Sequence, residues 1–266
     1  MKKLDREEVK RIQIEILDTV TDFCDQNGIS YWLDCGTLLG AIRHKGYIPW
    51  DDDIDIGMLR EDYDKFSELF NKSNERYRFV NIHNKEDFYV AFGKIIDVNT
   101  VLYEPNKNGN KLSVNIDLFV YDNAPDDDRL VNKMYNTRDR LRFIASFSRG
   151  NNILENDSLI KRIFKQILHI VCSPFSSNKC LKKVVINAKK YNGVDTSRVG
   201  NFTSISRIAC KKSILDSFVE VEFEGKFYKA PVGYDEWLKE FFGDYMELPP
   251  VEKRVTHHQY EAYWVE

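Results

Sequence analysis

The residues with the clearest chemical potential form one acidic run, Trp50-Asp51-Asp52-Asp53-Ile54-Asp55-Ile56-Gly57. Like charges this close repel one another outside bulk water unless a cation lies among them. Asp53–Ile56 alternates acids with isoleucine, a pattern typical of a strand. Asp53 and Asp55 would then share one face of a sheet, and the two isoleucines would face a core. Paired carboxylates are suitable ligands for Mg²⁺ or Mn²⁺ that bridges to phosphate oxygens.

A third acid and a small-residue turn add to this constellation. Asp117 lies in Val114–Val120, where apolar residues alternate to one face and Asp117 to the other. On a strand beside Asp53 and Asp55, it would complete a triad that holds a second metal or takes a proton from an attacking hydroxyl. The turn Gly36-Thr37 opens a short helix, whose backbone N–H groups could hold phosphate oxygens.

Other acids offer alternatives to this assignment. Asp51 and Asp52 are expected in the loop that leads into the strand, and Asp97 and Asp122 lie near strand ends, where either could replace Asp117. The whole run could also be a solvated loop. A calcium-binding scaffold is a weak alternative, because the positions that an EF-hand fills with Gly and Glu hold Ile56 and Asp62.

Several basic residues could contact substrate phosphates. Lys94 stands among strand apolars and needs a counter-charge, which either a nearby Asp or a substrate phosphate could supply. A packed C-terminal tail is expected from Pro249-Pro250 and its aromatic neighbours, against the alternative of a disordered charged tail. The basic candidates are Arg43, Lys94, Lys253, Arg254, His257 and His258.

Composition limits the class of protein. The chain of 266 residues has 42% hydrophobic residues, enough for a packed core, and a net charge of −3, which gives no drive toward nucleic acid. Five cysteines without a CxxC pair indicate a reduced cytoplasmic compartment and argue against zinc. No apolar run approaches the roughly 18 residues of a membrane span.

The elements that must position these residues alternate without a strict βαβ rhythm. We expect an α+β (mixed α/β) fold with a mixed sheet and flanking helices, in a single domain over residues 1–266 with a basic helical insertion at about 126–198. Helices are expected near residues 5–27, 36–42, 60–70, 128–190 and 234–242. Strands are expected near residues 29–33, 53–56, 78–82, 89–98, 101–104, 114–121, 202–208 and 219–228, the last a hairpin turning at Glu224-Gly225.

These motifs together resemble a known family. The blocks Tyr31–Arg43 and Gly46–Gly57 are similar to the signature of the LicD family of phosphocholine transferases. Asn115–Phe119 and the segment from Phe242 through Pro250 to His258 also match it. The resemblance implies a nucleotidyltransferase-like core, although Gly36-Thr37 stands where that superfamily usually has Gly-Gly or Gly-Ser.

The resemblance also implies an activity. It implies transfer of phosphocholine from CDP-choline to a sugar hydroxyl of a cell-surface glycan precursor, of teichoic acid or lipopolysaccharide type, with Mg²⁺ or Mn²⁺ and release of CMP. The acceptor would be a glycan or a lipid-linked glycan. Alternatives are transfer from another CDP-activated alcohol, such as ribitol phosphate, and a true nucleotidyltransferase that releases pyrophosphate.

Choline's quaternary ammonium calls for aromatic neighbours, because it cannot be hydrogen-bonded but is attracted to the face of a ring. Four aromatic residues crowd the acidic run in sequence, and the C-terminal part adds others; each could instead belong to the core. The cage candidates are Trp50, Tyr47, Tyr31 and Trp32, with Trp237, Tyr245 and Trp264 further along the chain.

A separate basic stretch runs from Ser158 to Lys190, with eight Lys or Arg and no acid. Its apolar residues fall on one helical face, beside Lys161, Arg162 and Lys165. One interpretation is a core-facing helix with a solvated basic side. The other is a helix on the inner membrane leaflet, where the enzyme would meet a lipid-linked acceptor.

Overall fold

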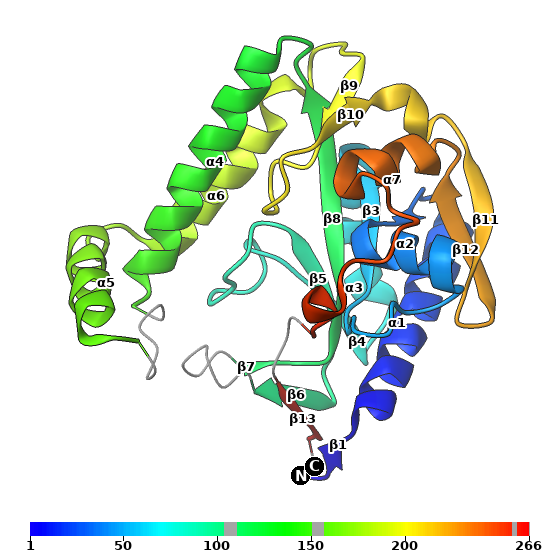
Figure 1. The fold of residues 1–266 in the computed structure, drawn as a ribbon, viewed down its shortest axis with the longest axis horizontal. Helices are drawn as coiled ribbons and strands as arrows, with labels where there is room; N and C mark the ends of the chain where they lie inside the picture. Colours follow the sequence, from blue (N-terminus) through cyan, green and yellow to red (C-terminus); the bar gives the residue numbers. More distant parts are fainter. Residues whose placement is uncertain (104–110, 151–156, 257–259, 266) are drawn as a thin grey trace.

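A seven-stranded mixed sheet forms the centre of the protein (Figure 1). The computed structural model describes residues 1–103, 111–150, 157–256 and 260–265. The strands run in the order β10-β9-β8-β3-β2, with β5 also on β8 and β4 on β5. Their bounds are β2 Trp32–Leu33, β3 Asp55–Leu59, β4 Tyr77–Val80, β5 Gly93–Asp97, β8 Asn115–Ala124, β9 Arg198–Gly200 and β10 Ala209–Lys211.

Strand β8 is the axis of this sheet. It pairs in parallel with β3, whereas β5 and β9 pair with it antiparallel, β5 along its first half and β9 at its end. Ile56 and Leu118, on β3 and β8, are fully buried on the face opposite the acids. The mixed pairing and flanking helices confirm the predicted α+β class.

Two smaller sheets complete the strand inventory of the described residues. The first has the order β1-β13-β6-β7 and joins the two ends of the chain (Figure 1). The second is the predicted hairpin, which turns at Glu224 and Gly225, both with positive φ. The bounds are β1 Lys3–Leu4, β6 Thr100–Tyr103, β7 Lys111–Leu112, β11 Phe218–Phe223, β12 Lys226–Pro231 and β13 Glu261–Trp264.

The helices begin and end with recognisable signals. The first helix opens with a capping box between Asp5 and Glu8 and ends at Gly28 in the left-handed conformation. Its Phe23 packs on Phe66 and Phe70 of α3, so α1 and α3 share one side of the core. The bounds are α1 Arg6–Asn27, α2 Cys35–His44, α3 Arg60–Ser73, α4 Asp128–Ser148, α5 Leu159–Cys172, α6 Ser177–Ala188 and α7 Tyr234–Phe242, with 3-10 turns at Lys189–Tyr191, Lys212–Leu215 and Val251–Lys253.

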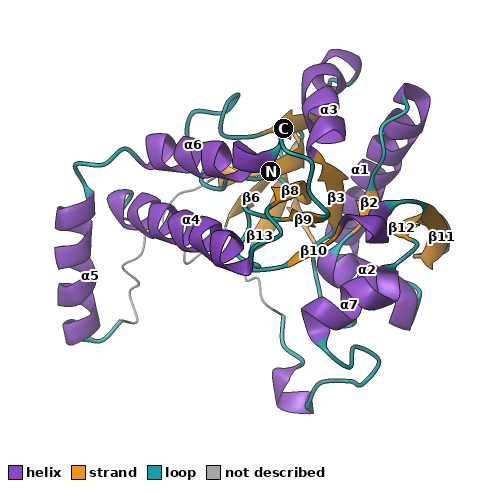
Figure 2. Ribbon diagram, turned by 90° about the horizontal axis from the view of Figure 1, so that it is seen from above, coloured by secondary structure: helices purple, strands orange, loops and turns teal. Residues whose placement is uncertain are grey.

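Helices α4, α5 and α6 form the predicted helical segment. α4 and α6 lie side by side, and α5 stands at their outer end, away from the sheet (Figures 1 and 2). α6 is tied to the rest through a small apolar cluster that includes Phe88, Ala145 and Val184. The apolar face of α5 is exposed, so the interpretation of this stretch as a core-facing helix is wrong for α5.

Three predicted strands differ from the structure. Residues 29–33 and 89–98 contain only the short strands β2 and β5. Residues 202–208, which alternate apolar and polar residues, form a loop between β9 and β10. The reason is that the fully buried Arg138 takes the carbonyls of Asn201, Ile205 and Ser206, which a strand would need for its ladder.

Candidate active site

Three charged side chains form a row across the central sheet. In the strand register, Asp55 on β3 lies opposite Asp117 on β8, and Asp117 lies opposite Lys94 on β5. Neighbouring strands are ~4.8 Å apart and paired residues project from the same face, so the three side chains are adjacent. The prediction that Asp117 lies on a strand beside Asp55 is confirmed.

Asp53 lies in the loop before β3, so its predicted place on the strand is wrong. The backbone there is held by side chains instead: Arg6 donates to the carbonyl of Asp51 and Gln13 to that of Asp52. As a result Asp51, Asp52 and Asp53 bring one oxygen each within 4.8 Å of one another. Asp51 and Asp52 are loop residues, as expected, and they join the cluster.

The surroundings of Asp55 disfavour the charged form of its carboxyl group. Burial raises the pKa of Asp55 well above its ordinary value, and the charges of Asp53, Asp117 and Asp34 raise it further. A divalent cation among these oxygens would remove that penalty. The cluster therefore holds several carboxylates around one buried acid, whose charged form is disfavoured.

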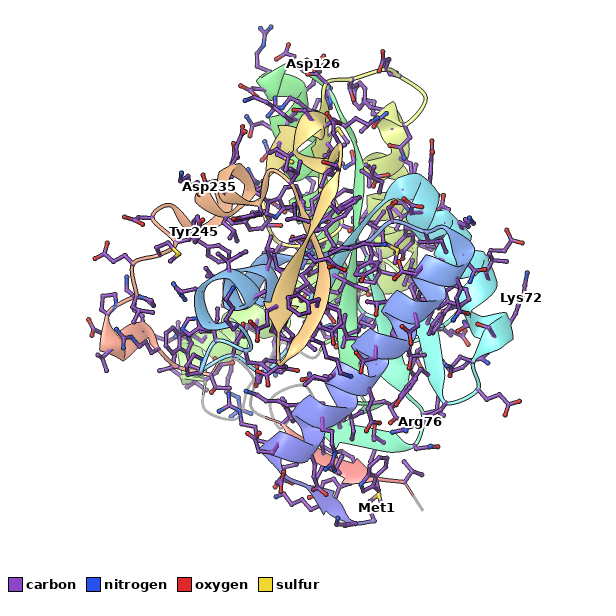
Figure 3. The ribbon with its side chains drawn as sticks, turned by 90° about the vertical axis from the view of Figure 1, so that its right-hand side faces the viewer. Met1, Lys72, Arg76, Asp126, Asp235 and Tyr245 are labelled. Carbon is purple, nitrogen blue, oxygen red and sulfur yellow. The ribbon has the colours of Figure 1, made fainter. Side chains whose placement is uncertain are left out.

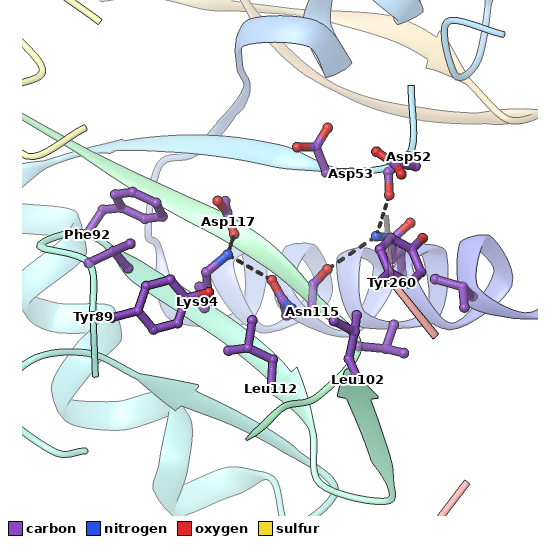
Figure 4. Close-up of a pocket in the computed structure, with 14 residues that line it drawn as sticks. Asp52, Asp53, Tyr89, Phe92, Lys94, Leu102, Leu112, Asn115, Asp117 and Tyr260 are labelled. Atoms are coloured by element: carbon purple, nitrogen blue, oxygen red, sulfur yellow. Dashed lines mark hydrogen bonds and ion pairs between the residues drawn. The ribbon is translucent and has the colours of Figure 1, made fainter. Parts of the chain in front are cut away.

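Lys94 is the counter-charge of Asp117 inside the protein. Its ammonium donates to Asp117 and, at 3.0 Å, to Oδ1 of Asn115 (Figure 4). Burial alone would lower the pKa of Lys94, but Asp117, Tyr89 and Asp53 outweigh it, so the pKa is raised. Of the two partners predicted for Lys94, the structure shows the nearby Asp.

Asp97 and Asp122 do not replace Asp117. Asp97 is fully buried and accepts from Arg76 at 2.8 Å. Asp122, also fully buried, accepts from Nε and Nη2 of Arg60 at 2.8 and 2.9 Å. Each of these acids is neutralised by an arginine within the fold.

The first turn of α2 contains Gly36 and Thr37 and contacts the acids. Thr37 is buried, and its hydroxyl accepts from the backbone N–H of Asp55 at 2.9 Å, so it is used inside the protein rather than directed at a phosphate. Gly36 lies against Asp51: a Cβ there would meet Asp51 Oδ2 at 2.6 Å. Of the two turn residues, Gly36 lines the neighbouring cleft.

Asp34 anchors that turn. It caps α2 through the N–H of Cys35 and accepts from Tyr121 Oη at 2.6 Å and Trp237 Nε1 at 3.1 Å. Burial raises the pKa of Asp34 to about 6, against these three donors, which lower it. Asp34 was not predicted as a site residue; its position one residue before the helix was the available signal.

A cleft of about 770 Å³ opens on one side of the carboxylates. Asp53 and Asp55 form part of its wall, and the rest comes mainly from α2, the loop before β3, the end of α7 and the segment after it. Tyr245 in that segment lies beside Asp235 on α7 and donates to it at 2.9 Å (Figure 3). The lining residues with rings or formal charges, besides those two acids, are Arg43, Trp50, Asp51, Phe241, Phe242, Asp244, Tyr245, Glu247 and Lys253.

A smaller cavity of about 190 Å³ lies beside Asp117 and Lys94 (Figure 4). Asp53 lines this cavity as well as the large cleft, and Asn115 and Tyr260 form its polar wall. The carboxylates therefore stand between two hollows of different size, and neither hollow could be deduced from the sequence.

The predicted basic residues other than Lys94 have different places in the structure. Arg43 lines the cleft and donates to the carbonyls of Tyr245 and Glu247, which holds the C-terminal segment against α2. Lys253 also lines the cleft, and Arg254 places its guanidinium 5.6 Å from the ring centre of Trp50. His257 and His258 lie outside the described residues.

Three of the four cage candidates are core residues, so their predicted role is wrong. Trp32 is 0% exposed and packs on Gly57, where a Cβ would lie 2.4 Å from the indole. Tyr31 and Tyr47 are buried too, with Lys229 and Lys10 over their rings.

Trp50 is the candidate that lines the cleft. Tyr245 and the unpredicted Phe241 and Phe242 share this wall, whereas Trp237 is fully buried and Trp264 belongs to β13. Phe241 and Phe242 carried a signal in the sequence, because they end an amphipathic helix at the point where the C-terminal motif begins with Phe242.

Comparison with known proteins places this site in a family. Residues 28–149 match the family described as LicD/FKTN/FKRP, nucleotidyltransferase domain. Lipopolysaccharide cholinephosphotransferase LicD of Haemophilus influenzae is 34% identical over 272 residues, 99% of each chain. An uncharacterized protein of Rickettsia typhi is 34% identical over 46% of this chain and 36% of its own length. Ribitol 5-phosphate transferase FKRP of Homo sapiens is 50% identical over 42 residues, 16% of this chain and 8% of its own.

The matched regions contain the site. Residues 28–149 include the turn at Gly36, the acids Asp53, Asp55 and Asp117, and Lys94. The similarity to the Haemophilus influenzae protein extends over essentially the whole chain and so also covers the C-terminal wall of the cleft. The chain therefore belongs to the LicD family.

Proposed function

We propose that this chain transfers phosphocholine from CDP-choline to a sugar hydroxyl of a lipopolysaccharide-type glycan and releases CMP. The observation that carries the proposal is the crowding of carboxylates at the start of β3, between two hollows, in a chain similar along its whole length to a lipopolysaccharide cholinephosphotransferase. Transfer of a substituted phosphate needs charge neutralisation, which a metal held by these carboxylates would supply, and positioning of two substrates, for which the two hollows offer space.

Asp53, Asp55 and Asp117 would hold Mg²⁺ or Mn²⁺. The ligand atoms of these three acids are oxygens, which these hard cations prefer. The proposal is supported by the raised pKa of Asp55, to which burial and then the charges of Asp53 and Asp117 contribute, because a cation would offset that repulsion. Lys94 binds Oδ1 of Asp117, so we assign Oδ2 to the metal or to the proton of the acceptor hydroxyl. The metal would neutralise the phosphate charge of the donor.

The donor fits the larger cleft. Its volume, about 770 Å³, falls within the range of small-molecule sites, roughly 300–1,000 Å³. Trp50, Phe242 and Tyr245 give it an aromatic wall that suits a trimethylammonium group, and Asp244 and Glu247 add negative charge. Gly36 and Lys253 lie where they could contact the diphosphate.

The acceptor hydroxyl would approach from the smaller cavity. Asp117 and Lys94 line that cavity, so an attacking hydroxyl there would meet Asp117, the group that we assign as its base. The enzyme would act in the cytoplasm, a reducing compartment that suits five cysteines without a CxxC pair. A teichoic acid precursor has the same kind of hydroxyl and is the alternative acceptor.

The products test this proposal directly. Purified protein is incubated with Mg²⁺, an oligosaccharide acceptor and, in parallel, CDP-choline, CDP-ribitol or CTP, and both CMP and the modified glycan are quantified. Choline-dependent CMP release with a phosphocholine-modified glycan is expected. Modification only from CDP-ribitol would assign another alcohol, pyrophosphate from CTP would assign a nucleotidyltransferase, and no turnover with any donor would overturn the proposal.

A further inference from the structure

Helix α5 faces the protein with the side that carries Lys165, Leu168, His169 and Cys172, of which Leu168 is the only large apolar residue. His169 Nδ1 lies 2.8 Å from the carbonyl oxygen of Phe147 at the end of α4, and Lys165 donates to Asp157, just before the helix, at 2.6 Å. Cys172 on the same side is buried. This orientation is the reverse of that of an ordinary amphipathic helix, which buries its apolar side.

The apolar side of α5 consequently faces outward. Leu159, Ile160 and Ile170 are 74%, 82% and 69% exposed. The spacing of the exposed apolar residues places them on one continuous face of the helix. They are Leu159, Ile160, Ile163, Phe164, Ile167, Ile170 and Val171, and Phe175 follows just after the helix, 52% exposed. A contiguous apolar surface of this kind marks an interaction site.

Positive charge borders this face on both sides. Lys161 neighbours Phe164 one turn along the helix, and Arg162 neighbours Leu159 one turn back. Both basic side chains are exposed. The segment Ser158–Lys190 holds eight Lys or Arg and no acid, in a chain whose net charge is −3. The charge around the face is thus opposite to that of an anionic phospholipid surface.

We propose that α5 docks the protein on an anionic phospholipid surface. The apolar face enters the boundary between head groups and acyl chains, and Lys161 and Arg162 extend to the phosphates on either side. The helix lies in the surface plane: 14 residues of α-helix reach ~21 Å, less than the ~30 Å hydrocarbon core. No helix among the described residues is long and apolar enough to cross a membrane.

A membrane is favoured over a second copy of the chain for an electrostatic reason. Two α5 helices packed face to face would bring Lys161 and Arg162 of each copy together, with no acid on either helix to pair with them. A lipid surface supplies the missing negative charge. The inference rests on the proposed function only in giving docking a purpose, because a lipid-linked acceptor lies in a membrane.

Co-sedimentation with vesicles tests the docking without any turnover. The full chain is mixed with vesicles of phosphatidylcholine and phosphatidylglycerol, or of phosphatidylcholine alone, at low and high salt. We expect binding to the anionic vesicles that weakens with salt. In the double variant Ile160→Ser/Phe164→Ser, the partition coefficient should fall about a hundred-fold, because two large apolar side chains no longer leave water.

Further variants test the basic residues beside the apolar face, and control variants test positions elsewhere on the protein. Lys161→Gln and Arg162→Gln should each lower anionic-vesicle binding about five-fold, which corresponds to ~1 kcal/mol. The matched control Ile186→Ser, at an equally apolar position 70% exposed on α6, should bind as the wild type does. Lys72→Gln/Lys211→Gln, two exposed lysines on other elements, should also have no effect. Thermal unfolding checks that each variant remains folded.

Three outcomes would overturn the inference. They are wild-type protein that ignores anionic vesicles at low salt, an Ile160→Ser/Phe164→Ser variant that binds normally, and a wild-type dimer that this variant converts to a monomer. Activity on a short soluble glycan separates this result from the proposed function: a docking variant should keep that activity. Loss of vesicle binding with intact soluble turnover supports docking, whereas intact vesicle binding without any turnover contradicts only the proposed chemistry.

Discussion

Strand β8 carries Asp117 near its start and Asp122 near its end, and the two acids have different surroundings. Asp122 accepts two hydrogen bonds from Arg60 and one from Asn192, at 2.8, 2.9 and 2.6 Å, in a fully buried network. Asp117 has Lys94 on one side and Asp55 on the other, with Asp53 close by. At the end of β8 an arginine balances the charge of Asp122, whereas near its start several carboxylates surround one lysine.

The difference separates a structural acid from one kept for a ligand. A buried acid with an arginine fork is satisfied by the fold, so removing it strands the arginine. Burial and the charges of Asp53 and Asp117 raise the pKa of Asp55, so its charged form costs stability; we propose that a bound cation offsets this cost. The following predictions test this contrast, starting with the largest effect.

The replacement Asp55→Asn should affect function far more than folding. It removes a carboxylate from the proposed metal site but keeps the shape, so turnover of CDP-choline should fall about a thousand-fold or more, which corresponds to ~4 kcal/mol. Steady-state CMP release with saturating Mg²⁺ measures the loss. Near-normal turnover by folded Asp55→Asn protein would contradict the assignment of Asp55 to the metal site.

The replacement Asp122→Asn should do the opposite. It leaves the guanidinium of Arg60 buried beside Asp64 alone, so the free energy of unfolding should fall by about 3 kcal/mol. Urea denaturation at neutral pH measures this loss. The double variant Asp122→Asn/Arg60→Met is the control: if it is no more stable than the single variant, the stranded charge is not the cause.

Thr37 links the two kinds of role, because its buried hydroxyl holds the backbone of Asp55. In Thr37→Val that N–H loses its acceptor, and we expect the free energy of unfolding to drop by about 1–3 kcal/mol. Mg²⁺ affinity, measured by calorimetry, should weaken as well. Thr37→Ser keeps the acceptor and should restore both; failure of this rescue would leave the loss to packing alone.

Trp50 tests the aromatic wall of the cleft. In Trp50→Ala, CDP-choline binding should weaken by about 1–2 kcal/mol through loss of a cation–π contact, with little change for CMP. Because Arg254 lies over the same ring, Arg254→Gln should leave that contact to choline and not weaken CDP-choline binding selectively. If Trp50→Ala weakened the binding of CDP-choline and of CMP equally, the indole ring would instead stack on the cytosine base or only pack in the cleft wall.

The smallest expected effect is on the pH dependence of stability without metal. A pKa raised by folding, as for Asp55 and for Asp34 at about 6, favours the protonated folded state, so this contribution is lost as pH rises through the raised pKa. Acids with a lowered pKa, such as Asp139, oppose it. In EDTA, Asp55→Asn should therefore lose less stability than wild type between about pH 4 and pH 8. Parallel curves would contradict the raised pKa of Asp55.

Local patterns in the sequence were sufficient for much of this protein. The capping box at Asp5, the hairpin at Glu224-Gly225 and the alternation around Asp117 each depend on neighbours along the chain, so their structures follow from a few residues. The family signature in Tyr31–Gly57 likewise lies in one stretch. Such features need no knowledge of distant contacts.

Other features depend on partners far along the chain. Asp117 and Asp122 look alike in the sequence, and only the fold brings Lys94 to one and Arg60 to the other. Trp50 and Trp32 were both candidates for the choline site, yet one lines the cleft and the other packs on Gly57. The strand expected at residues 202–208 is absent because Arg138 takes its carbonyls.

The helix α5 shows the same division most clearly. Its amphipathic pattern and its basic residues were determined by the sequence alone, because a helix repeats every 3.6 residues whatever surrounds it. Which side faces the protein was decided by the tertiary structure, through the contact of His169 with the end of α4 and the burial of Cys172. Side-chain spacing sets what a face contains, but burial depends on the elements that pack against it, and these come from distant parts of the chain.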